Sequence, residues 1–346
     1  MNRDDRRHAH DTVAARLGTY GDEELSALLA GGEPHETGIG GSSVLLSVEG
    51  VRVFVKKIPL TDLEARPEHH RSTANLFGLP PFYQYGVGSA GFGAWRELAA
   101  HLMTTGWVLD GEHAGFPLLH HWRVLPGSAG ADDGRSLDER VAYWDGSPAV
   151  RARLEAIAGS TASLVVFLEY FPHALYRWLP EQGPGAYARV EAELAATAAF
   201  MRDRGLVHFD AHYRNVVTDG RHHYLTDFGL AVGEDFDLSP GERAFLAVHR
   251  DYDLAYGAAH LVNHHIAARY RAGRGHGDFV AGWTRGERPA DVPAPVAEIL
   301  DRHAPTAVVM AGFLDRLIAG PKTTPYPVAE LAAAAHGRAS RAGAGG

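Results

Sequence analysis

The chain has 346 residues, of which 45% are apolar, enough for one large domain or two lobes with a sizeable core. Its 33 Lys and Arg residues against 42 Asp and Glu residues give a formal charge of −9, which argues against a general nucleic-acid binder. The absence of cysteine excludes disulfides and thiolate metal sites, and no apolar run is long enough to predict a membrane span. The charged N-terminus lacks the apolar segment of a signal peptide, so we expect a cytoplasmic protein.

The first half of the chain is predicted to be rich in β-structure. Residues 1–32 are highly charged and are interpreted as an N-terminal extension with one short helix. Residues 33–171 are predicted to form a lobe with insertions at about 61–94 and 126–160. The expected elements of this lobe are, in chain order, a hairpin over 44–58, a helix over 95–103, a strand over 116–125 and a strand over 164–170.

The second half is predicted to be mostly helical, which makes the whole chain an α+β protein. Residues 172–337 are expected to form this helical lobe, and the Ala-, Gly- and Arg-rich residues 338–346 are expected to be a disordered tail. The expected elements are a helix over 186–204, a tight hairpin over 215–226, and helices over 253–269 and 296–317.

A glycine-rich stretch, Gly38-Ile39-Gly40-Gly41-Ser42-Ser43, precedes the first strand of the predicted hairpin. Backbone without Cβ atoms can approach phosphate groups closely, and its N–H groups can donate to them. A plain tight turn also explains such a stretch. The chain contains no G-x-x-x-x-G-K-[ST] pattern, so the phosphate site is not a P-loop.

Lys56 lies within the apolar strand run Val53-Phe54-Val55-Lys56. A lysine in such a run is costly unless it is paired or functional. Its neighbour Lys57 is expected to point to the opposite side of the strand, into solvent.

The most specific pattern combines a polar loop with a tripeptide that follows it. His208, Asp210 and Asn215 fit H-x-D-x-x-x-x-N, and Asp227-Phe228-Gly229 begins 12 residues (227 − 215) after Asn215. A carboxylate can accept a hydroxyl proton, and amide and carboxylate oxygens can hold a magnesium ion. One predicted hairpin separates Asn215 from Asp227, so both metal-ligand candidates are expected at the ends of a small β-unit.

Taken in order, these motifs resemble the protein-kinase-like superfamily, which includes aminoglycoside phosphotransferases, choline kinases and bacterial Ser/Thr kinases. The resemblance runs from about Gly38 to the helix after Asp253. It implies a two-lobed fold, with a β-rich N-terminal lobe, a helical C-terminal lobe and ATP between them.

The resemblance also implies a role for each motif residue. Gly38, Gly40, Gly41 and Ser42 would cover the ATP phosphates and Lys56 would bind them, while the backbone of Glu169 to Phe171 would bind adenine. Asp210 would be the catalytic base, His212 would contact the γ-phosphate, and Asn215 and Asp227 would hold Mg²⁺.

Two structural partners remain open at this level. The family pairs the strand lysine with a glutamate, for which Glu97 is preferred over Glu64. Asp253, rather than Asp251, resembles the residue that anchors the backbone of the loop containing Asp210.

The acceptor of the phosphoryl group is expected to be a small hydroxylated molecule, such as an antibiotic, a sugar or a metabolite. His212 is typical of the small-molecule members, whereas Phe209 replaces the Arg by which many regulated protein kinases bind a phosphate. An atypical bacterial Ser/Thr protein kinase is the first alternative, and a non-catalytic nucleotide-binding or scaffold protein is the second. No nucleic-acid or membrane partner is expected.

Overall fold

The computed structural model describes residues 3–35, 42–128 and 134–342, and for 336–342 only the backbone. The chain is a mixed α+β protein with an antiparallel sheet, which agrees with the expected α+β class. It divides into two compact units. Unit 1 comprises Met1–Tyr170 and Asp227–Arg243, and unit 2 comprises Phe171–Thr226 and Ala244–Gly346. The segment Asp227–Arg243 was expected in the helical lobe, but it belongs to unit 1.

Unit 1 is built on a five-stranded sheet with the order β1-β2-β3-β5-β4 and antiparallel neighbours. Its strands are β1 (Glu33–Pro34), β2 (Ser42–Val48), β3 (Val51–Leu60), β4 (Leu119–Pro126) and β5 (Ala162–Glu169). Its helices and short helical turns are α1 (Arg3–Gly18), α2 (Asp22–Ala30), η1 (Pro67–His69), η2 (Pro81–Gln84), α3 (Ala94–Asp110), α4 (Leu137–Tyr143) and α5 (Pro148–Ala158). The two-residue strand β10 (Val232–Gly233) also belongs to this unit.

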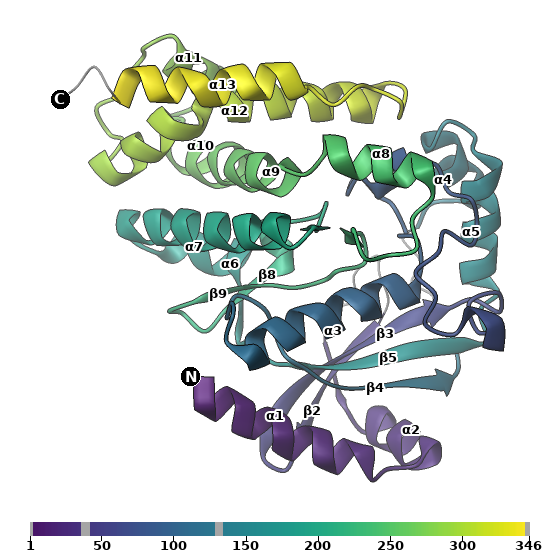
Figure 1. Cartoon of the computed structure of the whole chain (residues 1–346). Coiled ribbons are helices and arrows are strands. Elements are labelled where there is room, and N and C mark those ends of the chain that lie inside the picture. The colour runs from purple at the N-terminus through teal and green to yellow at the C-terminus, as the bar shows by residue number, and fades with distance from the viewer. Residues whose placement is uncertain (1–2, 36–41, 129–133, 343–346) are drawn as a thin grey trace. The chain divides into compact units, whose positions relative to one another are not determined.

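Helices cover both faces of this sheet, α1 and α2 on one side and α3 on the other (Figure 1). Successive side chains of a strand point to opposite faces, so β3 contributes Val53 and Val55 to the first side and Ile58 to the second. From α1, Val13 and Leu17 pack against the first face. Each face of the sheet therefore has its own apolar core.

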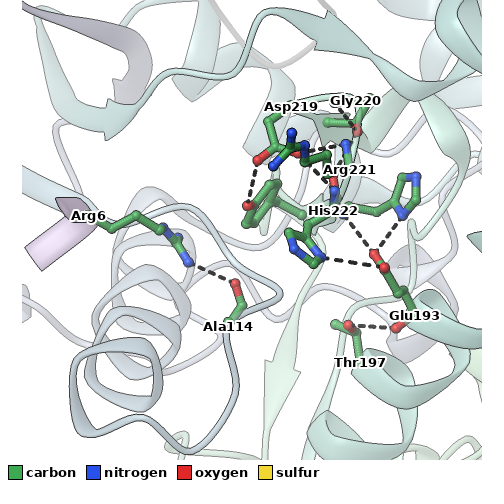
Figure 2. A network of polar contacts seen from close by, with 11 residues as sticks. Arg6, Ala114, Glu193, Thr197, Asp219, Gly220, Arg221 and His222 are labelled. Atoms are coloured by element: carbon green, nitrogen blue, oxygen red, sulfur yellow. Dashed lines mark hydrogen bonds and ion pairs between the residues drawn. The ribbon is translucent and has the colours of Figure 1, made fainter. Parts of the chain in front are cut away.

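The N-terminal residues form part of this core, which corrects the expectation of a charged extension. Two helices are present where one short helix was expected, and α1 is the one that charge patterning missed. Arg6 on α1 is 4% exposed and donates from Nη1 to the carbonyl of Ala114 at 3.0 Å (Figure 2). Its Nε and Nη2 donate to the carboxylate of Glu169 at 2.9 and 2.7 Å. A buried guanidinium with such partners ties α1 to the end of β5.

Unit 2 is mostly helical and contains a small antiparallel sheet with the order β6-β8-β9. Its strands are β6 (His173–Ala174), β7 (Leu206–Val207), β8 (Val216–Thr218) and β9 (His223–Leu225). Its helices are α6 (Leu175–Trp178), η3 (Leu179–Glu181), α7 (Pro184–Asp203), η4 (Tyr213–Asn215), α9 (Tyr252–His260), the π-helical turn η5 (Leu261–Ile266), α10 (Ala267–Tyr270), α11 (His276–Thr284), α12 (Ala294–Ala319) and α13 (Val328–Ala342). Helix α8 (Pro240–Val248) contains the division between the units.

The β8–β9 hairpin is fastened to α7 by Glu193 (Figure 2). The Glu193 carboxylate accepts a hydrogen bond from the backbone N–H of His223 at 3.0 Å and lies 3.5 Å from Nδ1 of His222. In the turn itself, Asp219 Oδ1 accepts from the N–H groups of Arg221 and His222 at 2.9 and 2.8 Å. These contacts fix the hairpin that follows the polar loop.

The expected disordered tail is also corrected. Residues 338–342 continue helix α13, and 343–346 lie outside the described residues. Within the described part of the chain, no helix is both long and apolar enough to cross a membrane.

A partly buried ionic cluster joins α7 to α12 within unit 2. Arg302 donates to both carboxylate oxygens of Glu191, at 3.0 and 2.6 Å, and Nε2 of His303 lies 2.6 Å from Glu191 Oε1. Burial raises the pKa of Glu191, but the hydrogen bonds and charges of His303 and Arg302 outweigh burial and lower the pKa from 4.5 to about 2.

We predict that this cluster makes the stability of unit 2 depend on pH. Because the folded-state pKa of Glu191 lies below its unfolded value, its contribution is present above pH 4.5 and is lost as the pH falls toward 2. The change Glu191→Gln should lower the urea midpoint at pH 7 and flatten its decline at acid pH. The exposed Glu181→Gln serves as the control. Equal pH slopes for wild type and Glu191→Gln would contradict the prediction.

Candidate functional site

Three charged residues from distant segments of unit 1 form one cluster. Nζ of Lys56 on β3 donates to Glu97 Oε1 on α3 and to Asp227 Oδ1, both at 2.7 Å. The side chains of Lys56 and Glu97 are 12% and 4% exposed, whereas that of Asp227 is 41% exposed. The cluster therefore has a buried side, at Glu97, and a solvent-accessible side, at Asp227.

Strand geometry and helix placement explain why Lys56 meets Glu97. Lys56 is two residues before Ile58 on β3, so both side chains point to the α3 face of the sheet. Glu97 stands in the first turn of α3, which packs on that face. The alternative partner, Glu64, is also buried, but it accepts from Arg153 Nη1 at 2.7 Å and from the N–H of Ala94 at 2.8 Å.

The two carboxylates keep the Lys56 ammonium charged. Burial by itself lowers the pKa of Lys56, but Asp227 and Glu97 more than compensate and raise it above its ordinary value. A charged ammonium that already lies beside the accessible carboxylate of Asp227 can bind an anionic group there. Phosphate oxygens are one such group.

The backbone around Asp227 is constrained on both sides. Asp227 has φ +64°, a left-handed conformation that is uncommon outside glycine and that often occurs at functional sites. Phe228 is fully buried against His101 of α3, at 5.0 Å between ring centroids, and against Phe116. A Cβ at Gly229 would lie 3.3 Å from Glu97 Oε2. The fixed Phe228 and the absent side chain at 229 hold Asp227 beside Lys56.

The polar loop of unit 2 brings Asp210 and Asn215 together. Nδ2 of Asn215 donates to the carbonyl and to Oδ2 of Asp210, both at 3.0 Å. Because this uses the amide nitrogen of Asn215, the amide oxygen is oriented away from Asp210. The turn is closed by the backbone, with the N–H of Asn215 donating to the carbonyl of His212 at 2.8 Å.

Asp253 at the start of α9 holds the backbone of this loop. Its two carboxylate oxygens accept from the N–H groups of His208 and Phe209, at 2.6 and 3.0 Å. Phe209 has φ +63° and its fully buried ring stacks on Tyr252. Asp251 is exposed and pairs with Arg202, so it is not the anchor.

His208 connects the loop to Thr226, the residue directly after β9. Its buried ring accepts at Nδ1 from the N–H of Asp210, at 3.2 Å, and donates from Nε2 to the carbonyl of Thr226, at 3.0 Å. The N–H of Thr226 in turn donates to the carbonyl of Asn215 at 2.9 Å. Thr226 is therefore held from both sides, and Asp227 follows it in the chain.

The structure says less about the positions of the remaining residues predicted for the site. His212 Nε2 lies 3.6 Å from Asp210 Oδ1, and both side chains are partly exposed. Ser42 begins β2 opposite Lys57, and Phe171 stacks on Tyr224 at 3.8 Å. The N–H of Glu169 donates to the carbonyl of Leu118, and its side chain is held by Arg6. Gly38, Gly40 and Gly41 lie outside the described residues.

Sequence patterns did not find Arg6 or His101, nor the left-handed conformations of Phe209 and Asp227. Arg6 stands in a charged helix without an apolar period, and a backbone angle has no signal in residue types. Among the described residues, no group of three or more His, Asp or Glu side chains is arranged to hold a metal ion. No protein-family model matches the chain, and no curated protein is significantly similar to it.

We predict that Lys56→Met destabilises unit 1 by about 3–5 kcal/mol, because Glu97 would remain as a buried charge without its cation. The double change Lys56→Met/Glu97→Leu should recover most of this loss, because both charges are removed together. Chemical denaturation measures both effects, with Lys57→Met as the control on the other face of β3. A double variant no more stable than Lys56→Met would contradict this account.

We predict that Asp253→Ala loosens the polar loop. Two buried N–H groups would lose their acceptor, at a cost of about 1–3 kcal/mol each. Amide hydrogen exchange at His208 and Phe209 should then become faster. Asp251→Ala changes an exposed carboxylate two residues away and should leave the exchange of these amides unchanged. Equal exchange in the two variants would refute the role of Asp253 as the anchor of the loop.

Proposed function

We propose that the chain is a magnesium-dependent phosphotransferase that moves the γ-phosphoryl group of ATP to a hydroxyl group, as the protein-kinase-like resemblance implies. The observation that carries this proposal is the contact of one charged, buried Lys56 with both Glu97 and Asp227. An inert structural lysine needs one buried partner. A second carboxylate that is 41% exposed and strained in its backbone suits a phosphate and metal site.

The oxygen donors of the chain fit Mg²⁺. In the proposed site Asp227 would supply its accessible carboxylate, and Asn215 would supply an amide oxygen, because its amide nitrogen already donates to Asp210. Magnesium in nucleotide sites takes only one or two protein ligands and completes its shell with phosphates and water. A nucleotide site therefore needs no larger group of protein ligands. When bound, the ion would neutralise phosphate charge.

The proposed chemistry is direct transfer. Asp210 accepts the proton of the acceptor hydroxyl, whose oxygen forms a bond to the γ-phosphorus. The bond from that phosphorus to the β–γ bridging oxygen breaks, and ADP leaves with the electron pair. Lys56 contributes a fixed positive charge beside the phosphates. The proposal requires Asp210 and Asn215 to act on the same nucleotide as Lys56 and Asp227.

Two features favour a small-molecule acceptor over a protein. The loop carries Phe209 as a buried core residue, so it offers no cation there to a regulatory phosphate. Ser239, the only Ser or Thr between Gly229 and Asp253 in the sequence, accepts at Oγ from the N–H of Glu242 at 3.2 Å. An antibiotic, sugar or metabolite acceptor is therefore proposed, and an atypical Ser/Thr kinase activity is the alternative.

We predict that Asp210→Asn lowers turnover by about 10²–10⁴-fold, because the amide cannot accept the hydroxyl proton. Nucleotide affinity should be nearly unchanged, since Asp210 acts on the acceptor. Transfer of labelled phosphate from ATP or GTP, with Mg²⁺ or with a chelator, measures this, and Asp251→Asn is the matched control. Near wild-type turnover in Asp210→Asn would remove Asp210 as the base.

The acceptor is identified by offering aminoglycosides, sugars and generic proteins separately to the purified protein with labelled nucleotide. Label in a small molecule supports the preferred acceptor class, and label only in protein supports the alternative. Nucleotide binding without transfer to any acceptor supports a scaffold protein. If neither ATP nor GTP binds, the proposed function is wrong.

A further inference from the structure

The insertion between β3 and α3, residues 61–93, supplies no residue to either cluster described above. It is nevertheless in contact with the segment that follows Asp227, which also belongs to unit 1. These two parts of the chain are about 150 residues apart in sequence, as the separation of 146 between Gln84 and Leu230 illustrates. The hydrogen bonds described below join side chains of the insertion to backbone groups of that segment.

The first contacts lie close to Asp227. The side-chain amide of Gln84, which is 3% exposed, donates to the carbonyl of Leu230. Further along, Thr73 Oγ1 accepts from the N–H of Asp237 at 2.8 Å. The insertion is thus hydrogen-bonded to the backbone of this segment at two separate points, Leu230 and Asp237.

The far end of the segment is held by a buried ion pair. Nη2 of Arg96 on α3 donates to Glu242 Oε1 at 2.6 Å, and the two side chains are 2% and 5% exposed. Nε of Arg96 donates to the carbonyl of Thr73 at 2.7 Å, so the same arginine joins the insertion to the segment. Arg96 precedes Glu97 in α3, which places this pair and the Lys56 cluster on one helical turn.

The tightest approach involves two glycines. Gly91 has φ +73°, and a Cβ built on it would lie 2.5 Å from the carbonyl oxygen of Gly229. No real Cβ approaches a backbone oxygen so closely, so any side chain at 91 must displace Gly229. Gly229 is two residues from Asp227, whose strained backbone depends on its neighbours for support.

We propose that the insertion 61–93 is a positioning element for Asp227, which it acts on through the backbone of residues 229–237. The proposal rests on the phosphotransferase function, in which Asp227 holds the metal. Gly91 and Gln84 are positioning residues, since they touch Gly229 and Leu230 rather than the reacting groups.

Gly78 in the same insertion gives a matched control. Its φ of +63° is close to that of Gly91, but a Cβ there meets nothing within 4 Å. Alanine therefore strains the backbone similarly at both positions, and only Gly91→Ala also pushes against Gly229. A general loss of loop stability would affect both variants, whereas a positioning role distinguishes them.

The test compares wild type, Gly91→Ala and Gly78→Ala in the full chain. Amide hydrogen exchange is measured over residues 229–238 without nucleotide, and phosphoryl transfer is measured against Mg²⁺ concentration. Gly91→Ala should speed exchange and raise the half-saturating Mg²⁺ concentration, each by about tenfold, because small displacements of a positioned group are costly. Gly78→Ala should change neither.

Equal exchange in Gly91→Ala and Gly78→Ala would overturn the proposal. If Gly91→Ala does not fold, Gln84→Met decides, since it removes the bond to Leu230 with a side chain of similar length. Gln84→Met should speed exchange over the same amides, and unchanged exchange would count against the positioning role of the insertion. Absence of transfer in wild type would contradict the phosphotransferase function, while the exchange result would still decide the role of the insertion.

Discussion

Burial of the Lys56 ammonium is the constraint on which unit 1 depends. An ammonium group removed from water must be compensated by nearby negative charge, and here two carboxylates supply it from α3 and from the segment after β9. The strand, the helix and the segment are thereby fixed to one another at a single nitrogen atom. Because Glu97 is buried and Asp227 is not, the same contact that stabilises the core leaves one carboxylate open to ligands.

In unit 2 the corresponding constraint is a backbone one. Phe209 is held in a left-handed conformation that only strong local contacts can maintain, and it receives them from the carboxylate of Asp253 and from its own buried ring. The loop is then rigid enough for Asn215 to face Asp210. Positive φ at Phe209 and at Asp227 places local strain in each of the two clusters.

Residue spacing predicted the hairpin of β2 and β3, the buried strand β5 and the pattern containing Asp210, Asn215 and Asp227, because these depend on periodicity and short loops. It favoured Glu97 over Glu64 as the partner of Lys56 but did not exclude Glu64, since spacing alone does not show which carboxylate reaches the lysine. The structure distinguishes the two glutamates, because Glu64 is paired with Arg153. Contacts between distant segments, such as that of Gly91 with Gly229, leave no periodic signal in a single sequence.

The two N-terminal helices have a practical consequence for handling the protein. Composition alone would suggest starting a truncated protein near Glu33, where the charged residues end and the strands begin. A chain begun there would lack Val13, Leu17 and the other residues that cover one face of the sheet, and would leave Glu169 without the guanidinium that neutralises it. Such a truncated protein would expose an apolar surface that promotes aggregation in solution. Expression boundaries and affinity tags therefore belong before α1.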